Sequence, residues 1–192
     1  MDKNLWANIE KGDKESYSSA YIFYYKKLYN YGKKITDDIP MIEDSINEVF
    51  IMIWTNREAI HKIVSPQAYI FSSFRNNIFR KIKSVKTIRL SDEEQQTEFQ
   101  FAIDSIIIQR ETDTGLKAGI EKALQQLTDR QREAIFLRFY EGLSYTEIAG
   151  VMNISVKATY KIMARALTQL KEIFSIPTVL LFTILKQLIQ VI

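Results

Sequence analysis

The sequence predicts an all-α protein of two small helical domains joined by a flexible linker. Glycine occurs only six times and proline three times in 192 residues, and apolar residues recur at steps of three and four over most of the length. A polar, acidic stretch interrupts this pattern near the middle. A chain of this length with 46% hydrophobic residues is able to bury one modest core or two small ones. We expect the domains at residues 1–86 and 116–174, a linker at 87–115 and an apolar C-terminal tail at 175–192.

The first domain is expected to hold four helices, each marked by apolar residues at helical spacing. The first two span residues 5–12 and 16–31. The pattern breaks at residues 37–40, and a third helix follows at 42–58. The fourth, at 66–86, opens on a proline, which is tolerated in the first turn of a helix.

The linker carries an acidic cluster and then a short apolar patch, which is typical of a solvated tether with at most a short helix near residues 101–109. The cluster consists of Asp92, Glu93, Glu94 and Glu98. The tail is strongly apolar, but Lys186, Gln187 and Gln190 make it too polar to span a bilayer comfortably. We expect a terminal helix packed on its own domain or on a partner, and a helix on a membrane surface is the alternative.

Two capping boxes place helix starts in the second domain. Thr128 with Gln131, and Ser144 with Glu147, fit the pattern in which a hydroxyl and the side chain three residues later satisfy each other's free backbone amides. Gly142, between them, is a helix stop signal.

Residues 144–167 then predict a helix-turn-helix. Asn153 falls in the turn, and asparagine is the best substitute for glycine in left-handed backbone. The apolar residues around it have the spacing at which two steeply crossing helices bury their facing sides. They are Ile148, Ala149, Met152, Ile154, Thr159 and Ile162.

The second helix of this motif suits the major groove of duplex DNA. Its cap, first turn and following cations form one set, Ser155, Val156, Lys157, Ala158, Lys161 and Arg165. No acidic residue occurs from position 148 to 171. Lysines and free amides would contact phosphates while first-turn side chains lie near base edges. The alternative is a helix pair with lysines on an ordinary solvated face.

A second basic segment lies at the end of the first domain, and it has six cations with no acidic residue between them. The cations are Arg75, Arg80, Lys81, Lys83, Lys86 and Arg89, and they are interleaved with Phe71, Phe74 and Phe79. Basic charge with aromatics and with amides such as Asn76 and Asn77 suits single-stranded nucleic acid. The alternative is a solvated basic face with the phenylalanines in the core.

The segment MIEDSINEVFIMIWTNRE combines a polar edge with an apolar stripe. The edge is Asp44, Asn47, Glu48 and Glu58, and the stripe is Val49, Phe50, Ile53 and Trp54. Paired carboxylates suit acid–base catalysis, but the chain has no cysteine and one histidine. It also lacks a glycine-rich phosphate cradle. We therefore expect no enzyme activity, metal, cofactor or small-molecule substrate, and favour a protein-binding face.

The charge and the N-terminal residues bear on partners and location. The formal net charge of +3 and the pI near 8.9 are compatible with a polyanionic partner. Charged and apolar residues alternate over the first ten positions, without the long apolar run of a signal peptide. We expect a cytoplasmic protein.

In this order, these features resemble the extracytoplasmic-function (ECF) group of bacterial RNA polymerase sigma factors, within the sigma-70 family. The resemblance is carried by IEDSINEVFIMIW, SPQAYIFSSFRNNIFRKIK and LQQLTDRQREAIFLRFYEGLSYTEIAGVMNISVKATYKIMARALTQL. It covers about residues 8–86 and 116–173. It implies a four-helix sigma domain two and, after the linker, a helix-turn-helix sigma domain four.

The resemblance also implies roles for individual residues. The first domain would grip the clamp helices of core RNA polymerase through Asp44, Asn47, Glu48, Phe50 and Trp54, with Asn47 in place of the usual glutamine. The promoter −10 element would be bound by His61, Arg75, Asn76, Asn77, Arg80, Lys81 and Lys83. The −35 element would be bound by Ser155, Val156, Lys157, Ala158, Tyr160, Lys161 and Arg165.

The implied function is that of a sigma factor, which binds core RNA polymerase, directs it to a set of promoters and assists promoter melting, without covalent catalysis. Such factors are commonly held inactive by an anti-sigma factor, and a contribution of the apolar tail to that contact is a hypothesis. Two alternatives stay open. One is a helix-turn-helix transcriptional regulator without polymerase-core binding, and the other is an enzyme that acts on nucleic acid through Asp44 and Glu48.

Overall fold

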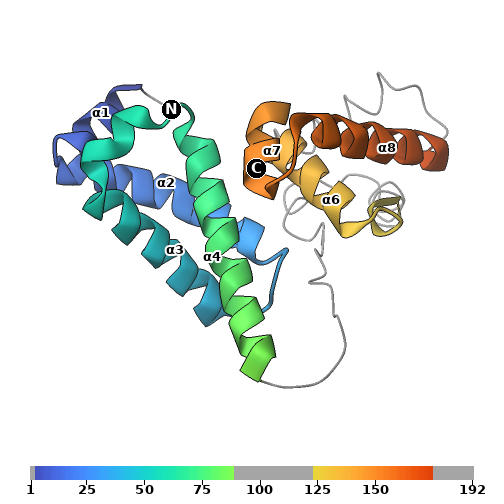
Figure 1. Cartoon of the computed structure of the whole chain (residues 1–192), viewed down its shortest axis with the longest axis horizontal. Helices are drawn as coiled ribbons and strands as arrows, with labels where there is room; N and C mark the ends of the chain where they lie inside the picture. The colour runs from blue at the N-terminus through green and yellow to red at the C-terminus, as the bar shows by residue number, and fades with distance from the viewer. Residues whose placement is uncertain (1–2, 89–122, 175–192) are drawn as a thin grey trace, which may run out of the picture. The chain divides into compact units, whose positions relative to one another are not determined.

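The computed structural model describes residues 3–88 and 123–174, which belong to two compact units, Met1–Gln96 and Thr97–Ile192. Throughout these two ranges the regular structure is helical, with no strand, so the predicted all-α class is confirmed (Figure 1). The expected short helix at 101–109, the acidic cluster and the tail at 175–192 lie outside the described residues. Across the described ranges, no helix has both the length and the apolar character needed to cross a membrane.

The described part of the first unit, residues 3–88, contains four α-helices and one 3₁₀ turn. These are α1 (Lys3–Glu10), α2 (Lys14–Gly32), α3 (Ile39–Thr55), η1 (Arg57–Lys62) and α4 (Pro66–Ile88). Helix α3 packs against both α2 and α4, while α1 packs on α2 and η1 (Figure 1). All four predicted helices are present, with boundaries shifted by a few residues.

Aromatic and aliphatic side chains fill the core of this unit. The ring of Tyr31 lies between Phe71, at 5.5 Å, and Phe74, at 5.9 Å. All three rings are fully buried, together with Leu28 and Ile42. Burial of each such side chain contributes roughly 1.5–3 kcal/mol to folding. Of the two alternatives left open for Phe71 and Phe74, nucleic-acid stacking or a place in the core, the structure shows the core for both.

The start and end of α3 correct two sequence predictions. The expected break at residues 37–40 is instead the start of the helix, because the Asp38 side chain accepts a hydrogen bond from the Met41 amide at 3.0 Å. Pro40 sits in the first turn, where its missing N–H costs nothing. The helix ends at Thr55 rather than at Glu58, which lies in η1.

The second unit contains α6 (Asp129–Ile135), a π-helical turn η3 (Phe136–Tyr140), α7 (Tyr145–Met152) and α8 (Val156–Phe174). Both predicted capping boxes are confirmed. The Thr128 and Ser144 side chains accept the amides of Gln131 and Glu147, and the side chains of those residues accept the cap amides in return. Gly142 has a φ of 73°, in agreement with its predicted place after a helix end.

The turn between α7 and α8 has the predicted left-handed residue. Asn153 has φ 52° and ψ 51°, and the Ile154 amide donates to the Ala149 carbonyl at 3.0 Å. On α8, the Thr159 side chain is fully buried, with its hydroxyl donating to the Ser155 carbonyl at 3.3 Å. The helix-turn-helix is confirmed.

The composition of the buried helix–helix surface is only partly as predicted. Ile148, Ala149, Met152 and Thr159 are buried, but Ile154 and Ile162 are half-buried. The buried residues of α8 are Thr159, Met163, Ala166 and Leu170. The buried stripe therefore contains Met163 rather than its neighbour Ile162.

Two glycine-to-alanine substitutions test this packing. A Cβ atom on Gly32 would lie 2.7 Å from Ile42 Cγ2 and 3.0 Å from Phe74 Cζ. We expect Gly32→Ala to lower the free energy of unfolding of the first unit by about 1–3 kcal/mol through overpacking. A Cβ atom on Gly150 in α7 would meet nothing within 4 Å. Gly150→Ala should therefore raise the stability of the second unit by about 0.5–1 kcal/mol. Urea unfolding monitored by circular dichroism measures both, and equal effects would contradict the packing at Gly32.

Candidate nucleic-acid interface

Helix α8 presents a cationic face opposite its buried stripe. Lys157, Lys161 and Arg165 follow one another at four-residue steps and are all exposed. Ser155 caps the helix, because its hydroxyl oxygen accepts the Ala158 amide at 3.1 Å. The positive end of the helix dipole and the first-turn amides therefore lie in the same turn as Lys157. Such a helix end attracts phosphate.

An aromatic contact extends this face onto α7. The ring of Tyr160, which is exposed, lies 4.5 Å from the ring of Tyr145. The guanidinium of Arg138 lies 5.2 Å from the Tyr145 ring and donates to the Leu143 carbonyl at 2.9 Å. Sequence reasoning missed Tyr145 and Arg138, because tertiary packing brings them together: α7 on α8 places Tyr145 beside Tyr160, and η3 on α7 places Arg138 beside Tyr145. Val156 is also exposed, whereas Ala158 is half-buried.

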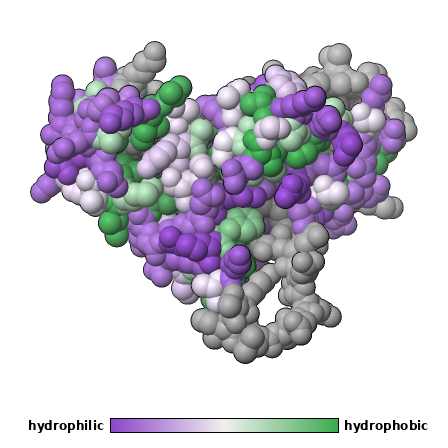
Figure 2. Space-filling view, viewed as in Figure 1, coloured by the Kyte–Doolittle hydropathy of each residue, from purple (hydrophilic) through white to green (hydrophobic). Residues whose placement is uncertain are grey.

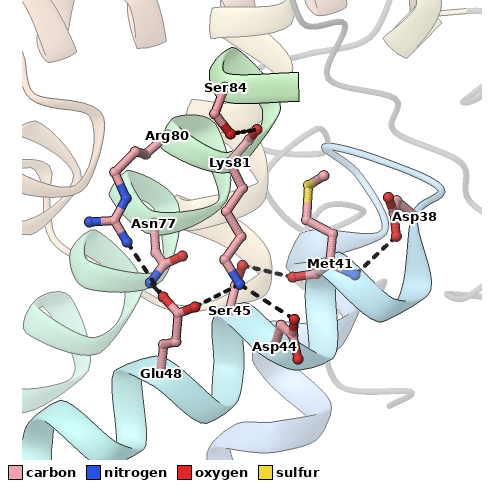
Figure 3. Close-up of polar contacts among 9 residues, drawn as sticks. All are labelled: Asp38, Met41, Asp44, Ser45, Glu48, Asn77, Arg80, Lys81 and Ser84. Carbon is pink, nitrogen blue, oxygen red and sulfur yellow. Dashed lines mark hydrogen bonds and ion pairs between the residues drawn. The ribbon is translucent and has the colours of Figure 1, made fainter. Parts of the chain in front are cut away.

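In the first unit, three of the predicted −10 residues and two of the predicted polymerase residues meet in one polar cluster between α3 and α4 (Figure 3). The Asn77 amide donates to Glu48 Oε2 at 2.5 Å, and Arg80 Nη2 lies 3.4 Å from the same oxygen. Lys81 Nζ lies 2.9 Å from Glu48 Oε1 and 3.9 Å from Asp44 Oδ2. Two carboxylates on α3 thus face two cations and an amide on α4.

This cluster favours the ionised form of Glu48. The hydrogen bond from Asn77 lowers the pKa of Glu48 below its ordinary value, and the hydrogen bond from Lys81 is the second largest cause of this shift. Partial desolvation acts in the opposite direction. The side chain is 45% exposed, while those of Lys81 and Arg80 are 21% and 73% exposed. Ion pairs as exposed as these contribute little to stability, about 0–1 kcal/mol each.

The remaining predicted −10 residues lie apart from this cluster. His61 is on η1, and its Nδ1 lies 2.9 Å from Glu10 Oε1 of α1. The guanidinium of Arg75 lies 4.5 Å from the ring of Phe79, which is half-buried. Asn76 and Lys83 are exposed on α4. The structure therefore brings together three of the seven, Asn77, Arg80 and Lys81.

The predicted polymerase residues divide into exposed and buried ones. Phe50 is 1% exposed and packs against Tyr21 at 4.9 Å, so its expected role as a contact residue is wrong. Trp54 is half-buried, with its ring 4.9 Å from Tyr17. Asn47 is exposed and accepts a hydrogen bond from the Tyr21 hydroxyl at 2.9 Å.

Sequence reasoning missed Ile51, which is 63% exposed. It lies three residues after Glu48 and three before Trp54, so these side chains share one face of α3. The signal was available, because Ile51 falls outside the buried stripe of Ile42, Ile46, Val49 and Ile53. The outer face of α3 is thus acidic with one aliphatic side chain at its centre.

Comparisons with known proteins bear on the fold and the family of the chain. The family profile described as "Sigma-70, region 4" matches residues 117–170, which include α6, α7 and most of α8. The ECF RNA polymerase sigma factor SigM of Bacillus subtilis (strain 168) is 27% identical over 157 residues, covering 81% of this chain and 93% of SigM. The ECF RNA polymerase sigma factor SigL of Mycobacterium tuberculosis (strain ATCC 25618 / H37Rv) is 28% identical over 153 residues, covering 73% of this chain and 80% of SigL.

Together these comparisons support an ECF sigma factor of the sigma-70 family. Two solved structures share its fold. One is CnrH in complex with the cytosolic domain of CnrY, with a TM-score of 0.56 and 19% identity over 91% of this chain and 97% of that one. The other is the sigma factor RpoE in complex with the anti-sigma factor NepR from Bartonella quintana, with a TM-score of 0.60 and 18% identity. That match covers 84% of this chain and 98% of the other.

The surface of the protein is mostly hydrophilic in the view of Figure 2, with smaller hydrophobic areas between. Among the residues with described positions, no three or more histidine or acidic side chains gather in a way that would hold a metal ion. The polar groups that do gather, on α3, α4 and α8, are suited to binding macromolecules.

The Glu48 cluster predicts a pH-dependent stability. Because the folded-state pKa of Glu48 lies below its ordinary value of 4.5, its contribution is fully present above that value and is lost as pH falls through the folded pKa. We expect Glu48→Gln to lower the free energy of unfolding by less than about 1 kcal/mol near neutral pH, since the group is exposed. The difference from wild type should shrink at about pH 3 in urea titrations, and a difference that does not shrink would rule out a charge effect.

Proposed function

We propose that this ECF sigma factor docks on core RNA polymerase with the outer face of α3, holds the −10 strand along α4 and reads the −35 element with α8. The observation that carries the proposal is the outward row of Lys157, Lys161 and Arg165 beside the capped N-terminus of α8. Membership of the family supplies the context. The proposed domains are residues 1–86 and 116–174, joined by the linker 87–115.

The chemistry of α8 suits a major groove. Backbone amides at a helix N-terminus and lysines neutralise phosphates without regard to sequence. Side chains near the N-terminus of a recognition helix contact base edges. The proposed −35 set is therefore Ser155, Val156, Lys157, Ala158, Tyr160, Lys161 and Arg165. The Tyr145–Tyr160 ring contact supports this set, because it limits the motion of the one bulky exposed aromatic on that face.

The proposed −10 set combines charge with amides and one aromatic platform. It comprises His61, Arg75, Asn76, Asn77, Arg80, Lys81 and Lys83. The ring of Phe79 beside Arg75 is the only one of the three interleaved phenylalanines that is not fully buried. Cations that track a backbone beside an aromatic ring suit an unpaired strand, whose binding offsets the cost of melting.

The proposed polymerase contacts are Asp44, Asn47, Glu48, Ile51 and Trp54. An acidic rim around an exposed aliphatic side chain fits a partner surface with basic residues and an apolar recess. Phe50 supports this face from beneath, because it packs on Tyr17 and Tyr21 of α2.

We further propose that an anti-sigma factor controls the chain in the cytoplasm. The support is that two solved structures with this fold are described as complexes, one with the cytosolic domain of CnrY and one with the anti-sigma factor NepR. The chain would have no catalytic activity of its own, in keeping with a family of sigma factors rather than of enzymes.

Docking on polymerase is tested by a pair of isoleucine substitutions. Ile51→Asp places a charge at the centre of the proposed face and should reduce affinity for core polymerase at least about tenfold, as loss of an interface centre does. Ile22→Asp is the control, because Ile22 is also exposed but lies on α2. Co-purification with core enzyme and run-off transcription on genomic fragments are the measurements. A wild-type chain that binds duplex DNA but yields no core-dependent transcript would instead indicate a regulator that does not bind polymerase.

Recognition of the −35 element is tested with two lysines of α8. If Lys161 contacts a base edge, Lys161→Gln should weaken holoenzyme binding to a responsive promoter by about 1–3 kcal/mol. If Lys161 contacts a phosphate, the substitution should instead reduce the slope of log K against log salt concentration by about 1. Lys171→Gln is the matched control, since Lys171 is exposed in the last described turns of the same helix. Equal losses for both variants in filter-binding assays would argue against the proposed face.

A further inference from the structure

Glu48 connects the two proposed surfaces of the first unit. It belongs to the outer face of α3, and its two carboxylate oxygens engage Asn77, Arg80 and Lys81 of α4 (Figure 3). Those three residues are members of the proposed −10 set. A residue assigned to polymerase binding, Glu48, therefore holds three residues assigned to DNA binding.

The chemistry of these contacts resembles that of DNA binding. A carboxylate and a phosphate are both anions that accept hydrogen bonds from amide, ammonium and guanidinium donors. While Asn77 and Lys81 donate to Glu48, both donors are engaged and the positive charge of Lys81 is balanced. Asp44, at 3.9 Å from Lys81, adds a second negative charge, so two carboxylates face the two cations. Counterion release on DNA binding requires cations that are not already neutralised.

The contacts are also weak enough to exchange. The carboxylate of Glu48 is 45% exposed and Arg80 is 73% exposed, so water and a partner reach both. Exposed ion pairs of this kind exchange readily for other ionic contacts. A partner cation that took up Glu48 would leave the donors of α4 available.

We propose that Glu48 masks the strand-binding groups of α4 in the free factor, and that a partner engaging Glu48 unmasks them. The inference rests on the proposed function for the identity of the two surfaces. The masked ligand is single-stranded DNA, and the masking group is an intramolecular substitute for its phosphate.

Single-strand affinity of the isolated full-length protein tests this inference. Fluorescence anisotropy with labelled oligo(dT) should show that Glu48→Gln binds about three- to tenfold more tightly than wild type at low salt. The plot of log K against log salt concentration should steepen by about 0.7–1.4, which corresponds to one or two further phosphates neutralised on a single strand. Circular dichroism verifies that the variant is folded.

Two further variants separate masking from other effects. Glu43→Gln makes the same change of charge on α3, but the Glu43 carboxylate accepts a hydrogen bond from the Tyr25 hydroxyl at 3.2 Å. This variant should therefore bind single-stranded DNA with unchanged affinity. In Glu48→Gln/Arg80→Gln, the gain should fall because one of the released cations is gone. Equal gains for Glu43→Gln and Glu48→Gln would overturn the proposal in favour of net charge. Weaker binding by Glu48→Gln would overturn it in favour of a positioning role.

The result is separable from the test of the proposed function. If the wild-type chain supports core-dependent transcription and Glu48→Gln shows no gain in single-strand affinity, only the masking is refuted. If Glu48→Gln gains affinity while the wild-type chain yields no transcript, the masking stands and the sigma-factor function of this site is refuted.

Discussion

The cationic face of α8 depends on how completely the opposite face is buried. Thr159, Met163, Ala166 and Leu170 are almost fully buried against α6 and α7. Because side chains on a helix have a fixed angular spacing, committing these positions to the core turns Lys157 and its neighbours on the next turns to solvent. The orientation of the proposed DNA-binding groups is thus set by apolar contacts within the second unit.

The same constraint shapes the first unit, with a different result. The apolar stripe of α3 faces α2 and α4, which leaves its carboxylates beside α4 rather than fully in solvent. Glu48 therefore has two sets of possible partners, the cations of α4 and whatever docks on α3. Two binding surfaces that share a seam between helices are physically linked, whereas surfaces on unrelated faces would act independently.

Much of the fold followed from local signals. Both capping boxes, the positive φ of Asn153 and the cap at Ser155 involve residues within four positions of one another, so short-range hydrogen bonding and backbone sterics determine them. The predicted exposure of Lys157, Lys161 and Arg165 was also correct. The predicted start of α3 was wrong because the capping signal of Asp38 was overlooked. Asp38 caps the helix, and Pro40 is tolerated in its first turn.

The sequence by itself determined the helical class, the helix-turn-helix and the signs of charge along each helix, because these depend on spacing and neighbouring residues. Only the tertiary structure decided which aromatic residues are core and which charges meet. Phe50, Phe71 and Phe74 are buried and Ile51 is exposed because of how α2, α3 and α4 pack. The pairing of Glu48 with Lys81 joins residues 33 positions apart. No local spacing rule reaches that far, so the contact required the folded arrangement of α3 against α4.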